Sequence, residues 1–215
     1  MDKKGALEKG RFQYISSPDE TGNHLPGIQK ALDSGIQWIQ LRMKNRSVQE
    51  IENQSIELIK LAKPYQAICI LNDYYHKVQD LGFDGVHLGK ADAKPDLVRG
   101  IFGDSYLIGQ TCHTLQEFQD LDIESTDYVG FGPYKSSETK TNLTKTHGLA
   151  GFNSILNQLN LDNLPPIVGI GGLTIQDIPD ILSTKIHGIA ASALVKNNTT
   201  KDLQNLIKQI KEWTN

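Results

Sequence analysis

Eight short apolar segments recur along the chain, and they constrain the fold more than any other feature. Each is short for a helix and rich in β-branched or small residues, as is typical of strands buried on both faces of a parallel sheet. The segments are FQYIS (12–16), WIQLR (38–42), AICILN (67–72), GVHLG (85–89), YLIGQT (106–111), YVGFG (128–132), PIVGIG (166–171) and GIAASALV (188–195).

Helical patterns lie between these segments. Two capping boxes are predicted, one formed by Ser47 and Glu50 and the other by Thr114 and Glu117. After Ser47, apolar residues recur every three or four positions up to Ala62, which predicts a helix with one buried face. Thr174 is predicted to cap a further helix, which Pro179 shortens or kinks, and a last helix is predicted over about 200–213.

The alternation of strands and helices predicts parallel strands joined by right-handed crossovers. Eight such units in 215 residues fit a single (β/α)₈ barrel, the TIM barrel, over residues 1–215, with 1–11 as a flexible N-terminal extension. The alternative is an open, doubly wound sheet. The barrel is favoured because the eighth apolar segment is as continuous as the third, whereas an open sheet would have a more polar edge.

Composition limits the class of partner. The net charge is −3, which argues against a nucleic-acid-binding protein, and no apolar run is long enough to span a bilayer. The charged N-terminus is not followed by the apolar stretch of a secretory signal. Cys69 and Cys112 lie in strand-like segments and are predicted to be reduced core residues of a cytoplasmic protein. The sequence is compatible with a homo-oligomer.

Polar residues follow nearly every predicted strand, and in a (β/α)₈ barrel these positions form the active site. Strand two carries Gln40, Leu41 and Arg42 at its end, with Lys44 beyond it; strand three ends at Asn72 and is followed by Asp73; strand four is followed by Asp92; strand five ends at Thr111; strand six is followed by Ser137, Thr139 and Lys140; strand seven ends at Gly171 and is followed by Gly172; and strand eight carries Ala191 and Ser192.

Each of these residues also has an ordinary structural interpretation. An acid such as Asp73 after a strand is often a turn residue or helix cap, Arg42 and Lys44 can be solvated loop charges, and Gly171 can serve a tight turn. His87 is predicted to be a satisfied core histidine. Together, however, two acids beside cations suit a site where Mg²⁺ and a multiply charged anion meet. Glycine-rich turns and hydroxyls suit a second, phosphate-binding site.

An ordered set of motifs carries a resemblance to a known family. QLRMK, ND, GVHLGKAD, IGQTCHT, DYVGFGP, SETK, IGGL and GIAAS follow one another through most of the chain. In this order the sequence resembles thiamine phosphate synthases, which join hydroxymethylpyrimidine diphosphate to thiazole phosphate and release pyrophosphate. The family pattern usually has Glu at position 43 and Ser at position 111, where this chain has Met43 and Thr111, and this chain adds Glu138 to the SETK motif.

The resemblance implies a role for each matching residue. The pyrimidine diphosphate would be held by Gln40, Leu41, Arg42, Lys44, Asn72, Thr111 and Lys140, with Arg42, Lys44 and Lys140 stabilising the departing pyrophosphate. Asp73 and Asp92 would bind Mg²⁺. The thiazole phosphate would be bound by Ser137, Thr139, Gly172, Ala191 and Ser192. The reaction would need positioning and charge neutralisation but no general base.

Two other functions remain open at the level of sequence. A related thiazole tautomerase shares the barrel but shifts a proton without a metal, and His113 lies where an acid or base would act. A catalytically silent barrel that binds thiazole or thiamine phosphate is the third interpretation. Asn72, Asp73, Asp92 and Lys140 favour the synthase, because a tautomerase has no pyrophosphate to hold.

Overall fold

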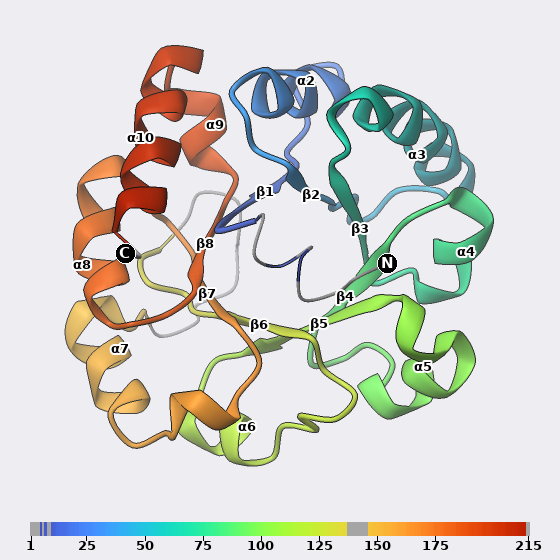
Figure 1. Cartoon of the computed structure of the whole chain (residues 1–215). Helices are drawn as coiled ribbons and strands as arrows, with labels where there is room; N and C mark the ends of the chain where they lie inside the picture. Colours follow the sequence, from blue (N-terminus) through green and yellow to red (C-terminus); the bar gives the residue numbers. More distant parts are fainter. Residues whose placement is uncertain (1–4, 6, 8–9, 137–145, 214–215) are drawn as a thin grey trace.

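The structure is a computed structural model that describes residues 5, 7, 10–136 and 146–213. Eight parallel strands form one closed barrel, each paired with its neighbours in sequence and the last with the first. The barrel is seen along its axis in Figure 1. The strands are β1 (Phe12–Ile15), β2 (Trp38–Leu41), β3 (Ile68–Asn72), β4 (Gly85–Leu88), β5 (Leu107–Cys112), β6 (Tyr128–Phe131), β7 (Ile167–Ile170) and β8 (Gly188–Ala191). The predicted (β/α)₈ barrel is confirmed.

Helices form a ring around the strands (Figure 1). The α-helices are α2 (Leu25–Asp33), α3 (Val48–Ala62), α4 (Val78–Leu81), α5 (Pro95–Phe102), α6 (Leu115–Gln119), α7 (Gly148–Leu156), α8 (Ile178–Ser183), α9 (Ala193–Asn197) and α10 (Thr200–Glu212). Short 3₁₀ turns are η1 (Lys63–Tyr65), η2 (Tyr75–Lys77), η3 (Gly103–Ser105), η4 (Leu161–Asn163) and η5 (Ile175–Asp177). Within the described part of the chain, no helix combines the length and apolarity needed to cross a membrane.

The helix starts agree in part with the capping predictions. Ser47 and Glu50 form the predicted reciprocal box at the start of α3. Thr114 caps α6 through its side chain, but the predicted box with Glu117 is wrong. The Glu117 carboxylate instead accepts from the backbone N–H of His113, at 2.6 Å, and pairs with Lys90. A glutamate three residues after a cap is therefore available to whichever donor lies nearest.

Two further predictions need correction at the carboxyl-terminal part of the chain. The capping box of Thr174 and Asp177 opens the 3₁₀ turn η5, and Pro179 lies in the first turn of α8, where proline fits without kinking the helix. The eighth strand ends at Ala191 rather than at 195, because α9 begins at Ala193. A continuous apolar run cannot by itself distinguish a buried strand from a buried helix.

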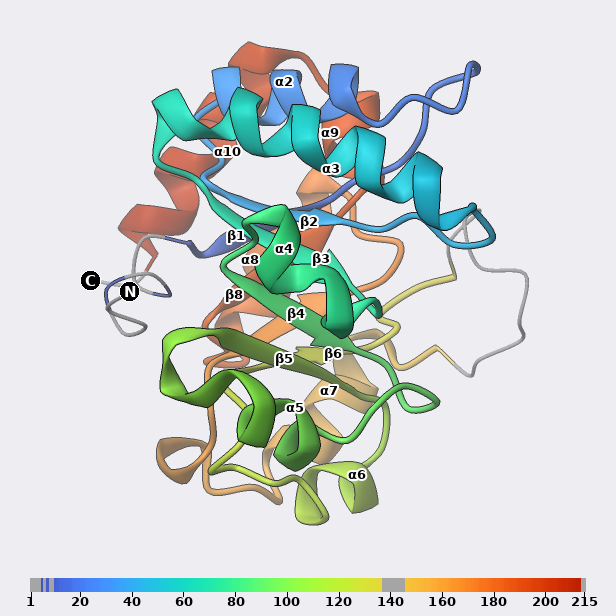
Figure 2. The same ribbon diagram turned by 90° about the vertical axis from the view of Figure 1, so that its right-hand side faces the viewer.

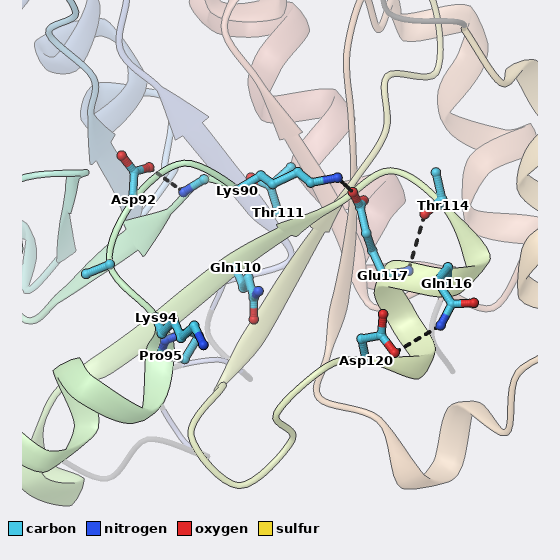
Figure 3. Close-up of a pocket in the computed structure, with 12 residues that line it drawn as sticks. Lys90, Asp92, Lys94, Pro95, Gln110, Thr111, Thr114, Gln116, Glu117 and Asp120 are labelled. Carbon is cyan, nitrogen blue, oxygen red and sulfur yellow. Dashed lines mark hydrogen bonds and ion pairs between the residues drawn. The ribbon is translucent and has the colours of Figure 1, made fainter.

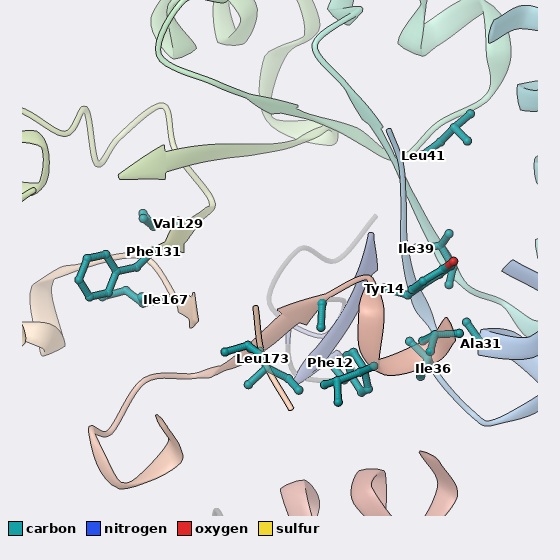
Figure 4. Packing of buried hydrophobic residues seen from close by; sticks show 14 of the residues in the cluster. Phe12, Tyr14, Ala31, Ile36, Ile39, Leu41, Val129, Phe131, Ile167 and Leu173 are labelled. Atoms are coloured by element: carbon teal, nitrogen blue, oxygen red, sulfur yellow. The ribbon is translucent and has the colours of Figure 1, made fainter. Parts of the chain in front are cut away.

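The strands separate two apolar layers. Alternate strand residues point outward and pack against the helices, as Phe12, Tyr14, Ile39 and Phe131 do in the larger cluster (Figure 4). The other residues of each strand point into the barrel. There a second cluster, which includes Leu7 and Trp38, fills the interior with apolar side chains. Apolar groups thus seal the barrel, so its chemistry is confined to the layer above them and to the loops that follow the strands.

Candidate active site

The candidate site lies at the carboxyl-terminal ends of the strands. The loops after β1, β2 and β4 extend from the same end of the barrel (Figure 2). Parallel strands of a closed barrel direct all their carboxyl ends to one mouth, which is where (β/α)₈ enzymes place their active sites. Arg42 follows β2, Asp73 follows β3, and Asp92 lies in the loop after β4. Residues far apart in sequence therefore meet here.

Asp73 and Asp92, nineteen positions apart, are in direct contact. Besides burial, a hydrogen bond between their carboxyl groups, which requires one of them to carry a hydrogen, is among the causes that raise the pKa of Asp73. Burial, followed by the hydrogen bond and the negative charge of Asp92, raises the pKa of Asp73 to about 6. Lys44 and Arg42 act in the opposite direction, and the Lys44 Nζ atom lies 3.7 Å from Asp73 Oδ2. Two acids forced together at a partly buried point form a site with a strong preference for positive charge.

The backbone around each acid fixes its position. Asp73 has a φ of 70°, in the left-handed region that aspartate tolerates better than most residues, and its N–H donates to the carbonyl of His87 at 2.9 Å. Asp92 Oδ2 accepts from the N–H of Gly89 at 2.6 Å, which closes the turn after β4. Both acids are thus turn residues, as the structural interpretation expects. Their mutual contact is an additional feature that turn formation does not require.

The acidic pair has the chemistry of a magnesium site. Among the residues that the structure describes, no three His, Cys, Asp or Glu side chains form a group that could hold a metal ion. A set of two carboxylates suits Mg²⁺, which takes its remaining oxygens from water and from substrate phosphates. The pair therefore fits the cofactor that the sequence predicts.

Arg42 is held from behind by two residues that the sequence analysis missed. The backbone N–H of Arg42 donates to Ser16 Oγ at 3.1 Å, and Ser16 Oγ lies 2.7 Å from His24 Nδ1. Burial, and then the positive charge of Arg46, lowers the pKa of His24 to about 4, so that its ring is neutral near pH 7 and can accept the Ser16 hydroxyl hydrogen. Burial also lowers the pKa of the Arg42 guanidinium, against the opposite effect of Asp73. The sequence feature that could have indicated this support is the polar residue Ser16, which directly follows the apolar residues of β1.

A polar layer fills the barrel directly below the mouth. Gln40 and Asn72 are 1% and 6% exposed, and Gln40 Nε2 donates to Gln13 Oε1 at 3.1 Å. His87 is a satisfied interior histidine, as predicted: its ring hydrogen-bonds the hydroxyls of Tyr128 and Thr111. The predicted ligands Gln40, Asn72 and Thr111 thus form the floor of the mouth.

Some predicted residues face away from the mouth. The side chains of Leu41 and Ala191 belong to the outer apolar cluster, so only their backbone groups are available to a substrate. Met43, where the family pattern has glutamate, is also buried there at 4% exposure. A side chain at position 43 is therefore directed into the apolar layer, which explains why methionine is tolerated.

On the opposite side of the mouth, glycine turns bring the backbone of two loops together. Gly171 and Gly172 have φ values of 105° and 60°, and a Cβ atom on Gly172 would lie 2.4 Å from the carbonyl oxygen of Ser136. Lys135 N donates to the carbonyl of Gly171 at 3.0 Å, so the loops after β6 and β7 cross in close contact. Ser192 directly follows β8 and precedes α9. The predicted ligands Ser137, Thr139 and Lys140, with Glu138, lie outside the described residues.

A cavity of about 380 Å³ opens between the loops after β4 and β5 (Figure 3). Asp92 and Thr111 line it, and Lys90 crosses it to reach Glu117 at 2.9 Å. His113 lies beside it, where its Nδ1 atom hydrogen-bonds the carbonyl of Gly132. The cavity therefore connects Asp92, one member of the acidic pair, with Thr111 of the polar floor.

The fold and this mouth define a (β/α)₈-barrel protein that pairs acids with cations at the carboxyl ends of its strands. The family model described as thiamine monophosphate synthase matches residues 13–195. The thiamine-phosphate synthase of Bacteroides fragilis strain YCH46 is 39% identical over 185 residues, which cover 86% of this chain and 91% of that protein. That of Flavobacterium johnsoniae is 36% identical over 203 residues, covering 94% and 95%. The chain belongs to the thiamine monophosphate synthase family.

Solved structures agree at the level of fold. Thiamine phosphate pyrophosphorylase from Pyrococcus furiosus superposes with a TM-score of 0.81 at 24% identity and covers 97% of this chain and 99% of its own. N-(5'-phosphoribosyl)anthranilate isomerase from the same organism has a TM-score of 0.63 at 12% identity, covering 94% and 99%. The sequence relatives confirm the predicted resemblance, and they favour the synthase over the tautomerase and the silent binding protein.

Proposed function

We propose that this chain condenses hydroxymethylpyrimidine diphosphate with thiazole phosphate, in a reaction that depends on Mg²⁺, to give thiamine phosphate and pyrophosphate. Family membership supports the reaction. The contact between the carboxyl groups of Asp73 and Asp92, beside Lys44 and Arg42, carries the proposal for the metal. A pair of acids in this position makes chemical sense where a cation and a polyanion bind together.

The cations of the mouth have a defined task in this reaction. A diphosphate leaving group gains negative charge as its bond to carbon breaks, and preorganised positive groups stabilise that charge. Arg42 is held by the Ser16 hydroxyl through its backbone, while the Lys44 side chain is half exposed and can turn from Asp73 to an incoming phosphate. Lys140 is proposed to add a third positive charge, and Mg²⁺ bound to Asp73 and Asp92 would neutralise further charge on the diphosphate.

The polar floor is proposed to orient the pyrimidine. Gln40, Asn72 and Thr111 offer amide and hydroxyl groups below the cations, which suits a ring with both hydrogen-bond donors and acceptors. Gly172, the backbone of Ala191, and Ser192 are proposed to bind the thiazole phosphate, together with Ser137 and Thr139. The two substrates would then meet between the charged side and the backbone side of the mouth, so that positioning supplies much of the catalysis.

The direct test is incubation of the protein with both substrates, with Mg²⁺ and with a chelator, followed by quantification of thiamine phosphate and pyrophosphate. We expect both products in equal amounts with Mg²⁺ and neither with the chelator. Product formation that is unaffected by the chelator would refute the metal assignment. No coupled product under either condition would refute the synthase.

A further inference from the structure

Five side chains from five strands form one hydrogen-bonded chain across the interior of the barrel. Gln40 Nε2 lies 3.1 Å from Gln13 Oε1, and Gln13 Nε2 lies 3.2 Å from Tyr128 Oη. Tyr128 Oη lies 3.1 Å from His87 Nδ1, and His87 Nε2 lies 2.8 Å from Thr111 Oγ1. The chain runs from the buried amides to the mouth, because Thr111 lines the cavity that also contacts Asp92.

Tyr128 fixes the direction of this chain. Its phenol is completely buried, and burial raises its pKa, so the hydroxyl carries its hydrogen near neutral pH. The hydroxyl accepts from Gln13. A buried hydroxyl must also place its own hydrogen. The side chains of Gln13 and Gln40 both hydrogen-bond the phenol in the sense that lowers its pKa, as donors to its oxygen do, which leaves His87 Nδ1 as the acceptor among the described partners of Tyr128 Oη.

The direction then passes to Thr111. An imidazole that accepts at Nδ1 carries its hydrogen at Nε2, and it donates that hydrogen to Thr111 Oγ1. Because the Thr111 oxygen accepts from His87, the hydrogen of the Thr111 hydroxyl is free to point into the mouth. The threonine is thereby presented as a donor with one orientation.

We propose that Tyr128 is a positioning residue that holds His87 in its Nε2–H tautomer, so that the Thr111 hydroxyl donates to an acceptor atom of the pyrimidine diphosphate. The substrate part of this inference rests on the proposed function. The tautomer part rests on the barrel interior alone. Gln13 supports the arrangement, because its amide supplies the hydrogen bond that orients the phenol.

The tautomer is measured first, on the substrate-free protein. Long-range ¹H–¹⁵N NMR spectra of histidine-labelled protein distinguish Nε2–H from Nδ1–H for each ring, and His87→Gln assigns the signal. We expect His87 as the Nε2–H tautomer in the unaltered chain and a shift toward Nδ1–H or protonation in Tyr128→Phe. An Nδ1–H ring in the unaltered chain overturns the proposal, and this measurement does not require an active enzyme.

Kinetics then test the consequence. Tyr128→Phe keeps the ring that packs against Trp38 at 4.8 Å between centroids and removes only the hydroxyl. We expect kcat/KM for the pyrimidine substrate to fall about tenfold, which corresponds to the loss of one oriented hydrogen bond. KM for thiazole phosphate is expected to stay unchanged. An unchanged kcat/KM for the pyrimidine overturns the proposal.

Two further variants separate positioning from general damage. Tyr14→Phe removes another buried tyrosine hydroxyl, from the outer layer of β1, and we expect no change in the His87 signal or in pyrimidine kinetics. In a Thr111→Val background, Tyr128→Phe is expected to have little further effect, because the two residues act through one contact. Thr111→Ser should restore the dependence on Tyr128. Equal effects of Tyr128→Phe with and without Thr111 would show a purely structural role.

Discussion

The two sides of the mouth are built in different ways. On the β2–β4 side, charged side chains crowd together: Arg42, Lys44, Asp73 and Asp92 interact within one cluster. On the β6–β8 side, the described residues present backbone turns at Gly171 and Gly172, packed against residues 133–136, and the charge of Lys135 is paired with that of Asp177. The two acids can recruit a cation, but their negative charges repel each other without it. Backbone turns have no such electrostatic cost but require glycine.

The charged side should give the largest effect on activity. Asp92→Asn retains an oxygen for the Gly89 N–H but removes one of the two negative charges. We expect turnover at limiting Mg²⁺ to fall about a hundredfold, the usual size for losing one group that stabilises developing charge. Steady-state rates across a Mg²⁺ titration measure this. Asp96→Asn, an exposed change in the first turn of α5, is the matched control.

Circular dichroism and thermal melting of Asp92→Asn should match those of the unaltered chain, because the turn hydrogen bond is preserved. Full activity of the variant at limiting Mg²⁺ would contradict the assignment of Asp92 as a metal ligand. A variant that melts well below the unaltered chain would show instead that Asp92 is chiefly a structural turn residue.

The backbone side should respond to shape rather than charge. In Gly172→Ala, a Cβ atom would be placed at a φ of 60° and 2.4 Å from the Ser136 oxygen. We expect a loss of roughly 2 to 3 kcal/mol in the free energy of unfolding, from the left-handed backbone plus the displaced loop, and a higher KM for thiazole phosphate. Denaturant unfolding and substrate kinetics measure the two effects.

Gly100→Ala supplies the control for that substitution. Gly100 lies within α5, and an added Cβ atom meets nothing within 4 Å. The change should stabilise the protein by about 0.5 to 1 kcal/mol, since alanine favours a helix. If Gly172→Ala and Gly100→Ala changed the free energy of unfolding and the KM for thiazole phosphate in the same way, the left-handed backbone at Gly172 would not be required for this side of the mouth.

Asp73→Asn is expected to stabilise the metal-free protein. A folded-state pKa of about 6 against an ordinary value of 3.8 means that the folded state binds more protons between these values, so stability is present at low pH and is lost as the pH rises through 6. Above that range the ionised Asp73 would lower the free energy of unfolding by about 3 kcal/mol if the site were dry, and solvent screening at this partly exposed group reduces the penalty to roughly 2 kcal/mol. Asparagine removes this penalty and tolerates the φ of 70°.

Thermal melting at several pH values tests this expectation. The advantage of Asp73→Asn in the presence of a chelator should be largest above pH 7 and should vanish near pH 4, where the unaltered carboxyl is protonated. Added Mg²⁺ should stabilise the unaltered chain but not the variant. An advantage that is constant with pH would place its origin in the turn conformation and not in the charge of Asp73.

Local sequence patterns were sufficient for the barrel and for the acidic pair. Buried strands leave long apolar runs, and parallel topology directs their ends to one mouth, so Asp73 and Asp92 could be predicted to meet despite their separation in sequence. The end of β8 could not be predicted, because the same apolar run continues from Ala191 into the buried helix α9.

The supporting residues of the site had no local signal. Gln13 and Tyr128 are 115 positions apart and meet only because the barrel closes. His24 is the N-cap residue of α2, and its side chain reaches back to Ser16, a contact set by the path of the loop rather than by a motif. Residues that touch a substrate carry recognisable motifs, whereas residues that hold them in place are defined by three-dimensional packing.

His113→Asn should give the smallest effect, and it separates coupling from proton transfer. His113 follows β5, between the two sides of the mouth, and its ring hydrogen-bonds the carbonyl of Gly132, a contact that an asparagine amide can replace. Coupling requires no proton transfer at this residue, so the rate of thiamine phosphate formation should stay within about tenfold, below the usual contribution of a positioned acid or base. In a tautomerase, the same change would abolish proton exchange on the thiazole ring, and chelation of Mg²⁺ would have no effect. The rates of thiamine phosphate formation and of thiazole proton exchange, measured in His113→Asn and in Asp92→Asn, should show opposite patterns for a synthase and a tautomerase.

We expect Asp92→Asn to slow thiamine phosphate formation and His113→Asn to leave it nearly unchanged. A metal-independent isomerisation that disappears with His113, with no thiamine phosphate formed, would show that the mouth moves protons and does not join two substrates.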